Sequence, residues 1–123
     1  MFMSLNDIIL FLGALAFVFV FCLMFVPKRP HPDDSGEFLI IPFVLWFPIR
    51  IPLAQINIRQ APEQILRSRY LIREVGMTLG RIRSGRYYHR KLKIELRIYL
   101  RGKCNDFVYF EYKGERFIVN NWN

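Results

Sequence analysis

The densest run of side chains able to bind a charged ligand lies in residues 76–102, GMTLGRIRSGRYYHRKLKIELRIYLRG. This segment carries eight Lys or Arg residues and a single acid, Glu95. A solvated strand face needs polar side chains for solubility alone, which accounts for part of the charge, but the excess of one sign goes beyond that need. Positive charge at this density attracts anions, such as nucleic acid, the headgroups of a membrane or an acidic protein.

Some of these basic residues alternate with apolar ones, which places several of them on one face of a predicted strand. We expect a basic surface turned toward anionic lipid or a membrane protein partner, formed by Arg81, Arg83, Arg86, Arg90, Lys91, Lys93 and Arg97. Nucleic acid is an alternative ligand, because neighbouring tyrosines could stack on bases. It is the less favoured partner, since the sequence has no RNA-recognition, helix-turn-helix or zinc-finger pattern.

Patterns typical of catalysis or of metal binding are absent from the sequence. There is no His-Glu-x-x-His, Cys-x-x-Cys or Gly-x-Ser-x-Gly motif, and the glycines match no phosphate-binding loop. His31 lies between two prolines without a second ligand nearby. His89 lies among basic residues, where we expect a turn or surface role. The sequence therefore predicts no enzyme, no cofactor and no metal site.

A long apolar segment precedes all of these residues. Ile8–Val26 has nineteen consecutive uncharged residues, which as a helix rising ~1.5 Å per residue crosses a hydrocarbon core of ~30 Å. A cleaved signal peptide would have a basic start, a shorter apolar core and a small-residue cleavage site, and a buried core helix is a third alternative. We predict a transmembrane anchor over residues 1–26. Cys22 falls inside it and Cys104 far outside, so we expect free thiols.

The charges that flank this segment predict its orientation. Lys28 and Arg29 follow the apolar run and no basic residue precedes it, which is typical of a helix whose C-terminal end is cytoplasmic. We therefore expect a single-pass protein of the cell membrane with its N-terminus outside and residues 27–123 in the cytoplasm. All 18 basic residues and all acids except Asp7 lie in that part, which has a net charge of +9.

Two segments connect the anchor to the basic region. Residues 27–37, PKRPHPDDSGE, have the composition of a semi-rigid linker that reaches no more than about 34 Å. The apolar run Phe38–Ile49 is too short to span a membrane and is interrupted by prolines, so we expect one or two strands. Its aromatic residues either belong to an ordinary core or form a loop that enters the lipid interface; the residues concerned are Phe43, Trp46 and Phe47.

The rest of the chain, within a domain spanning residues 38–123, has mainly the pattern of strands. Residues 50–59 alternate between apolar and polar side chains toward their end, which predicts a strand. Ala61–Ser68 has the composition of a short helix. Lys91–Arg101 has a strict period of two, with one face formed by Leu92, Ile94, Leu96, Ile98 and Leu100.

Two further strands are expected after this one, at residues 107–112 and 116–120, separated by turn sequences. Three strands in this order predict an antiparallel meander. Gly76, Gly80 and Gly85 precede it, and they suit bends or bulges in a sheet that must curl.

The order of these features resembles the bacterial PH-like (pleckstrin-homology-like) domains. The resemblance rests on Ile51-Pro52-Leu53 entering a strand, on Gly80 and Gly85 before Arg86-Tyr87, and on the final Phe117-Ile118-Val119. It implies a mainly β fold, a small antiparallel β-barrel or sheet after the membrane helix. The chain departs from the family because it has no obvious C-terminal helix. One helix followed by a domain of this size is also similar in layout to the sublancin-type immunity proteins of bacteriocin producers.

These features together predict a non-catalytic, membrane-anchored binding module at the inner face of a bacterial membrane. A bacteriocin immunity protein is one such module, whose partner would be a bacteriocin peptide or the target of that peptide. An accessory subunit of a membrane complex and a membrane-tethered nucleic-acid-binding protein are the alternatives. A homo-oligomer is compatible with each of them.

Overall fold

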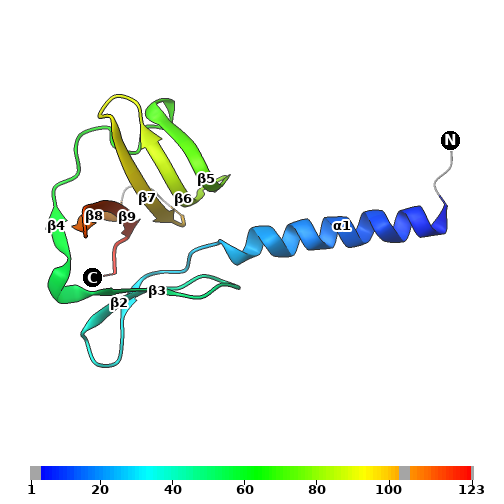
Figure 1. Ribbon diagram of the computed structural model, residues 1–123, viewed down its shortest axis with the longest axis horizontal. Helices are drawn as coiled ribbons and strands as arrows, with labels where there is room; N and C mark the ends of the chain where they lie inside the picture. Colours follow the sequence, from blue (N-terminus) through cyan, green and yellow to red (C-terminus); the bar gives the residue numbers. More distant parts are fainter. Residues whose placement is uncertain (1–3, 103–105, 123) are drawn as a thin grey trace.

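The computed structural model of the chain describes residues 4–102 and 106–122 (Figure 1). Within these residues the protein is mainly β, with one long helix, α1 (Leu5–Met24), that projects from a domain of nine strands. The strands form two sheets, one of three strands and one of six. The mainly β class and the single N-terminal apolar helix, both predicted from the sequence, are confirmed.

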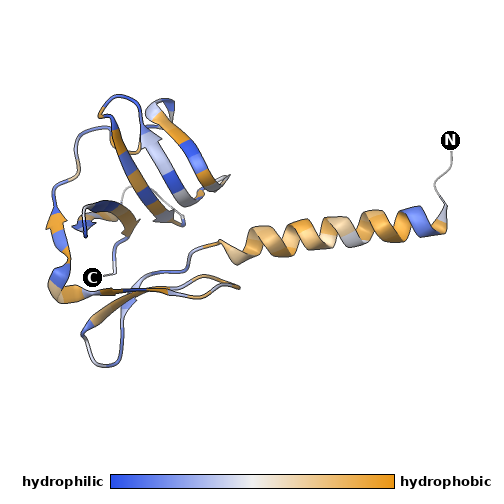
Figure 2. Ribbon diagram, viewed as in Figure 1, coloured by the Kyte–Doolittle hydropathy of each residue, from blue (hydrophilic) through white to orange (hydrophobic). Residues whose placement is uncertain are grey.

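Helix α1 begins before the uncharged run because a capping box fixes its start. Ser4 Oγ accepts a hydrogen bond from the Asp7 backbone N–H at 3.2 Å, and Asp7 Oδ2 accepts one from the Ser4 N–H at 3.4 Å. None of the helical residues is buried, and most residues along the whole length of the helix are apolar (Figure 2). The helix is long and apolar enough to cross a membrane, which fits an anchor or a signal sequence.

The smaller sheet is antiparallel and has the order β1 (His31–Pro32), β2 (Phe38–Ile41), β3 (Ile49–Pro52). Residues 27–37, expected as a linker, contribute β1 and the turn that follows it. Asp33 organises this turn, because its Oδ1 accepts hydrogen bonds from Ser35 Oγ at 2.9 Å and from the Phe38 N–H at 3.3 Å. The turn chemistry of the Asp-Asp-Ser-Gly sequence thus converts a polar segment into a hairpin.

After η1 (Leu53–Gln55), a 3-10 turn, the chain enters the larger sheet, whose strand order is β4-β8-β9-β7-β6-β5. The bounds of its strands are β4 Asn57–Arg59, β5 Leu71–Leu79, β6 Ile82–His89, β7 Ile94–Leu100, β8 Phe107–Tyr112 and β9 Glu115–Asn120. Neither sheet closes on itself within the described residues, so the barrel form of the PH-like expectation is not confirmed.

The predicted meander is wrong at one position, because β9 lies between β7 and β8 and pairs with β7 in parallel. Burial explains this order. Phe117, Ile118 and Val119 are consecutive and all buried, which is typical of a strand covered on both faces. Such a strand is most stable in the centre of the sheet, whereas β8 is buried over fewer residues. The link from β7 to β8 includes residues 103–105, which lie outside the described residues.

The larger sheet has two faces with separate apolar clusters. The front face, which carries Tyr99, Phe110 and Phe117, packs against β2 and β3 of the smaller sheet through Leu39 and Ile51. The back face is covered by the segment 61–70, whose Ile65 is buried; its buried members on the sheet are Tyr87, Leu96, Ile98, Leu100, Tyr109 and Ile118. The strict alternation expected in Lys91–Arg101 therefore ends in Ile98, Tyr99 and Leu100, which are all buried.

Strands β5 and β6 approach each other very closely at a pair of glycines. Gly76 and Gly85 are register partners with φ of +133° and +134°. A Cβ on Gly76 would lie 2.1 Å from Ser84 O, and one on Gly85 would lie 2.1 Å from Val75 O. Only glycine fits either position, and a register shift between Arg73 and Val75 adds a bulge beside them.

The segment 61–70 does not form the expected α-helix. It folds as turns followed by η2 (Ser68–Tyr70), a 3-10 helix, and it covers the back face. His89, expected in a turn or on the surface, is fully buried beneath this segment. Its Nδ1 accepts a hydrogen bond from the Leu92 N–H at 3.0 Å, and its Nε2 lies 3.4 Å from Gln64 O. The imidazole therefore has a structural role between two loops.

Candidate functional site

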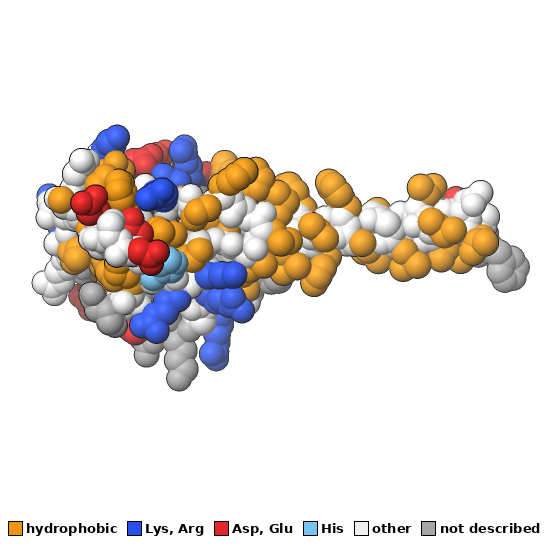
Figure 3. Space-filling model, turned by 90° about the horizontal axis from the view of Figure 1, so that it is seen from below, with side chains coloured by type: hydrophobic (Ala, Val, Ile, Leu, Met, Phe, Trp, Pro, Cys, Tyr) orange, Lys and Arg blue, Asp and Glu red, His pale blue; other side chains and the backbone are white. Residues whose placement is uncertain are grey.

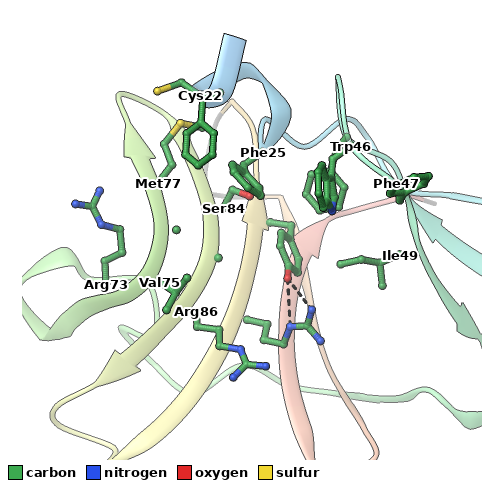
Figure 4. Close-up of a pocket in the computed structure, with 16 residues that line it drawn as sticks. Cys22, Phe25, Trp46, Phe47, Ile49, Arg73, Val75, Met77, Ser84 and Arg86 are labelled. Atoms are coloured by element: carbon green, nitrogen blue, oxygen red, sulfur yellow. Dashed lines mark hydrogen bonds between the residues drawn. The ribbon is translucent and has the colours of Figure 1, made fainter. Parts of the chain in front are cut away.

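A groove of about 860 Å³ lies where the end of α1, the loop of residues 42–48 and strands β5, β6 and β7 meet. This volume is typical of a site for a small ligand. Most of its lining is apolar and comes from Phe21, Cys22, Phe25, Phe43, Trp46, Phe47, Ile49, Val75, Met77 and Tyr99. The close-up in Figure 4 places Cys22, Phe25 and Met77 at the helix end and Arg86 farther from it, with Arg73 at the outer edge of β5.

Backbone hydrogen bonds fix the helix end to the loop of residues 42–48. The Val44 N–H donates to Val26 O at 3.0 Å, and the Lys28 N–H donates to Pro42 O at 2.8 Å. The rings of Phe25 and Trp46 are in contact, with centroids 5.9 Å apart. Because both walls of the groove are joined in this way, its position relative to the end of α1 is set by the fold.

The two alternatives for the aromatic residues of this loop apply to different side chains. Phe43 belongs to the core, with 8% of its surface exposed and its ring edge-on to Tyr99 at 5.4 Å. Trp46 and Phe47 are 48% and 78% exposed. Phe43 is therefore buried between the two sheets, whereas within the described residues nothing covers the outer surface of Trp46 and Phe47.

The arginines at the far end of the groove differ in their pairing. Arg73 and Arg86 are exposed, and neither forms an ion pair within the part of the chain that the structure describes. Arg86 is the register partner of Val75 on β5 and of Arg97 on β7. Two unpaired arginines on neighbouring strands thus line an apolar groove, where an anion would be attracted.

Arg97 is held in place by its neighbours. Its Nη2 donates to Tyr99 Oη at 2.9 Å and its Nη1 donates to Glu115 Oε2 at 3.1 Å, while its guanidinium lies 4.9 Å from the Phe117 ring centroid. Partial burial acts to lower the pKa of Arg97, but the interactions with Tyr99 and Glu115 outweigh it and raise that pKa. The charge of Arg97 is therefore balanced by Glu115.

The seven basic residues predicted to share one surface are divided among four places. Arg86 and Arg97 line the groove on the front face. Arg83 is on the back-face side, where its Nη1 donates to Leu66 O at 2.9 Å. The rest occupy the turns at the two ends of β6, roughly 26 Å apart for a strand of this length; they are Arg81 at one end and Arg90, Lys91 and Lys93 at the other.

Two of these turn residues bind the segment that covers the back face. Arg90 donates a hydrogen bond to Arg69 O, and the Lys91 ammonium lies 5.3 Å from the centroid of the Tyr70 ring. Seen from below, Lys and Arg side chains are visible both on the β domain and beside the base of the apolar helix (Figure 3). The positive charge of this molecule is therefore distributed, with a small part of it in the groove.

The contribution of β5 and of the helix end to the groove was not predicted from the sequence. Arg73, Val75 and Met77 recur at a spacing of two residues, which is the signal that could have found them. The glycines and the bulge hid this signal, because they interrupt the pattern of a regular strand. Phe25 and Cys22 carry no local signal for a groove, since they belong to a uniformly apolar segment.

In the part of the chain that the structure describes, no group of three or more His, Cys, Asp or Glu side chains could hold a metal ion. The expected absence of metal, cofactor and catalysis stays a prediction. Cys22 is a free thiol, and Cys104 lies outside the described residues.

No protein-family model, curated protein sequence or solved structure matches this chain. The resemblance to PH-like domains and the similarity in layout to immunity proteins therefore stay predictions.

Proposed function

We propose that the chain is a non-catalytic binding module that α1 anchors in a bacterial membrane, with the β domain held directly against the inner, cytoplasmic face. The observation that carries this proposal is the junction between helix and loop. Backbone hydrogen bonds join the end of α1 to a loop whose Trp46 and Phe47 are exposed. Exposed aromatic side chains beside a membrane helix favour the headgroup level, with tryptophan preferring it most. The domain would then rest on the lipid surface.

The proposed orientation depends on the charges next to the helix. Lys28 and Arg29 follow the helix end and are both exposed, and Asp7 is the only charged side chain in α1. Positive charge on the C-terminal flank favours a cytoplasmic β domain. The loop of residues 42–48 and the groove would then face the inner leaflet.

Protection against a membrane-active peptide is the biological role that we propose for such a module, with a PH-like domain as its binding part. A subunit of a membrane complex is the alternative within the same class. The scatter of the basic residues over both faces and both ends of β6 counts against a single nucleic-acid-binding surface. Resistance to a bacteriocin on expression of the chain would favour immunity, and a stable membrane partner recovered from detergent would favour the subunit.

The two tryptophans of the chain provide a test of the interfacial position, because Trp46 and Trp122 lie in different surroundings. Trp122 is half-buried and packs edge-on against Phe110, with ring centroids 6.2 Å apart. We would reconstitute the full-length Trp122→Phe and Trp46→Phe variants, each with a single tryptophan, in vesicles whose lipids carry bromine near the headgroup. The fluorescence of Trp46 should be quenched, and that of Trp122 should not.

Equal emission of Trp46 in brominated and ordinary vesicles would contradict the proposal. Extraction of the full-length chain from cell membranes by alkaline carbonate would contradict it as well, because an integral helix resists that treatment. The orientation is tested separately, with a fluorescent protein that folds only in the cytoplasm fused to the C-terminus. Absence of fluorescence, with the fusion protein present in the membrane fraction, would reverse the proposed orientation.

A further inference from the structure

We infer that the groove binds one anionic phospholipid of the adjacent leaflet, with an acyl chain at the helix end and the phosphate at Arg73 and Arg86. This inference rests on the proposed function, since it requires the helix end to lie at the membrane surface. It goes further, because it names a ligand class and a binding site within the β domain.

The apolar half of the groove is continuous with the membrane-spanning helix. Phe21, Cys22 and Phe25 belong to the last turns of α1 or follow it directly, and they form one wall of the groove opposite Met77 (Figure 4). A span that ends at Met24 places this wall at the boundary of the hydrocarbon core. An acyl chain could therefore enter from the leaflet without crossing water, which is not so for a groove elsewhere on the domain.

The distance between the apolar half and the charged half of the groove suits a phospholipid, whose acyl chain and phosphate would occupy one half each. Met77 and Arg73 are four residues apart on β5, which is roughly 13 Å along an extended strand. This is the direction that leads away from the helix end in Figure 4, hence away from the bilayer. Guanidinium groups bind phosphate through paired hydrogen bonds, and those of Arg73 and Arg86 form no ion pair within the described residues.

Acidic residues near these arginines do not neutralise them. Glu74 follows Arg73, and Glu95 lies on the strand next to Arg86, as the register partner of Tyr88. Both are exposed, and within the described residues neither forms an ion pair with an arginine of the groove. The acid that does so is Glu115, which binds Arg97. Charge complementarity therefore favours an anion at Arg73 and Arg86.

The floor of the groove makes room for an extended chain. Gly76 and Gly85 lie between the apolar end and the arginines, and a Cβ on either would collide with backbone atoms. No side chain can fill this part of the site, which leaves a flat backbone surface between the two halves. A small soluble anion would need the arginines but not the apolar walls, so a phospholipid uses more of the site.

The experiment uses the full-length chain in nanodiscs of phosphatidylcholine. A trace of phosphatidylglycerol with a photoreactive group in its acyl chain is added, and the same label on phosphatidylcholine serves as the reference. After irradiation, peptides are mapped by mass spectrometry. We expect phosphatidylglycerol to label peptides containing Phe25 and Met77 about thirtyfold more than phosphatidylcholine does, the effect of two basic residues at ~1 kcal/mol each on an anionic headgroup.

The double variant Arg73→Gln with Arg86→Gln should abolish that preference. The matched control is Lys91→Gln with Lys93→Gln, which removes the same charge from the turn that follows β6, outside the groove lining, and should leave the labelling ratio unchanged. All four side chains are exposed, so folding should be retained, as circular dichroism would verify. A third variant, Val75→Trp, fills the groove from β5 and should reduce labelling by both lipids.

Several outcomes would overturn the inference. These are equal labelling of the groove by the two lipids, an equal loss of preference in the control variant, and labelling confined to the surface of α1 away from Phe25. Displacement of the label by soluble glycerol phosphate would instead indicate a water-soluble ligand. A crosslink from a photoreactive residue at Val75 to a second copy of the chain would indicate a dimer contact. Each result leaves the proposed function standing if Trp46 is still quenched in brominated vesicles.

Discussion

The front and back faces of the larger sheet use the same strands, β5, β6 and β7, and differ in how they are covered. On the back face, the segment 61–70 covers the sheet, and buried polar groups such as the His89 ring have partners. On the front face, the smaller sheet covers β7, β8 and β9 but stops short of β5. Val75 on β5 is consequently 68% exposed, and the uncovered part is the groove.

The two faces differ at a place where a small domain can hold a ligand without weakening its core. Both apolar clusters are complete without the residues at the arginine end of the groove. The groove forms because the smaller sheet does not extend over the whole front face of the larger sheet. The helix end and the loop of residues 42–48 form the wall on the side that the smaller sheet leaves open. The same covering elements bring the groove to the end of the apolar helix.

The largest expected effect on stability comes from separating β5 from β6, the strand pair that contributes to both faces. Replacing Gly85 by Ala places a Cβ 2.1 Å from Val75 O and 2.6 Å from Gly76 Cα, so β5 must separate from β6. We expect the free energy of unfolding to fall by about 3–5 kcal/mol. The measurement is chemical unfolding of the full-length chain in detergent, followed by circular dichroism.

Gly80→Ala is the matched control for this prediction. Gly80 also has a positive φ, of +58°, but an added Cβ would meet nothing within 4 Å. The variant should therefore cost only about 1–2 kcal/mol. Equal losses in the two variants would mean that backbone strain alone, and not the close approach of the strands, explains the glycine pair.

A pair of Val→Thr substitutions sharpens the contrast between the covered and uncovered parts of the front face. Val119 is fully buried under the smaller sheet, whereas Val75 faces the groove. Since the added hydroxyl must lose its contact with water at the first position only, Val119→Thr should destabilise by about 1–3 kcal/mol and Val75→Thr by less than about 0.5 kcal/mol. Thermal unfolding in the same detergent would compare them. A large loss for Val75→Thr would indicate that the groove is closed in solution.

The smallest effect that we expect is a pH dependence of stability that arises in the smaller sheet, which covers the front face. The burial of Asp33 would raise its pKa, but hydrogen bonds from Ser35 and from the Phe38, Glu37 and Gly36 backbone outweigh this and lower the pKa. The carboxylate therefore stabilises the fold above the unfolded pKa, roughly 3.9, and this contribution is lost as the pH falls through the lower folded pKa.

Stability of the full-length chain measured between pH 3 and pH 7 would test this prediction. The Asp33→Asn variant should be less stable than the native chain at neutral pH and should lose less stability on acidification. An unchanged pH profile in that variant would mean that another carboxylate controls the acid response of the smaller sheet.

Several elements were predictable because their signals are local. The uncharged run that becomes α1 needs only its own length and composition, and the alternation from Leu92 to Leu100 identifies β7 without knowledge of its neighbours. The turn before the last strand is equally local. In each case the physical cause, a repeat or a solvent preference, lies within a few residues.

The tertiary structure decided which strands pair, what covers each face and which charges meet. A period of two assigns side chains to faces but not to partners, so it could not place β9 beside β7 or bury Tyr99 beneath the smaller sheet. It also could not divide the basic residues, because Arg83 and Arg86 differ by the face they occupy and by the neighbours found there. The groove is the clearest case, since its walls come from segments far apart in sequence that only the folded chain brings together.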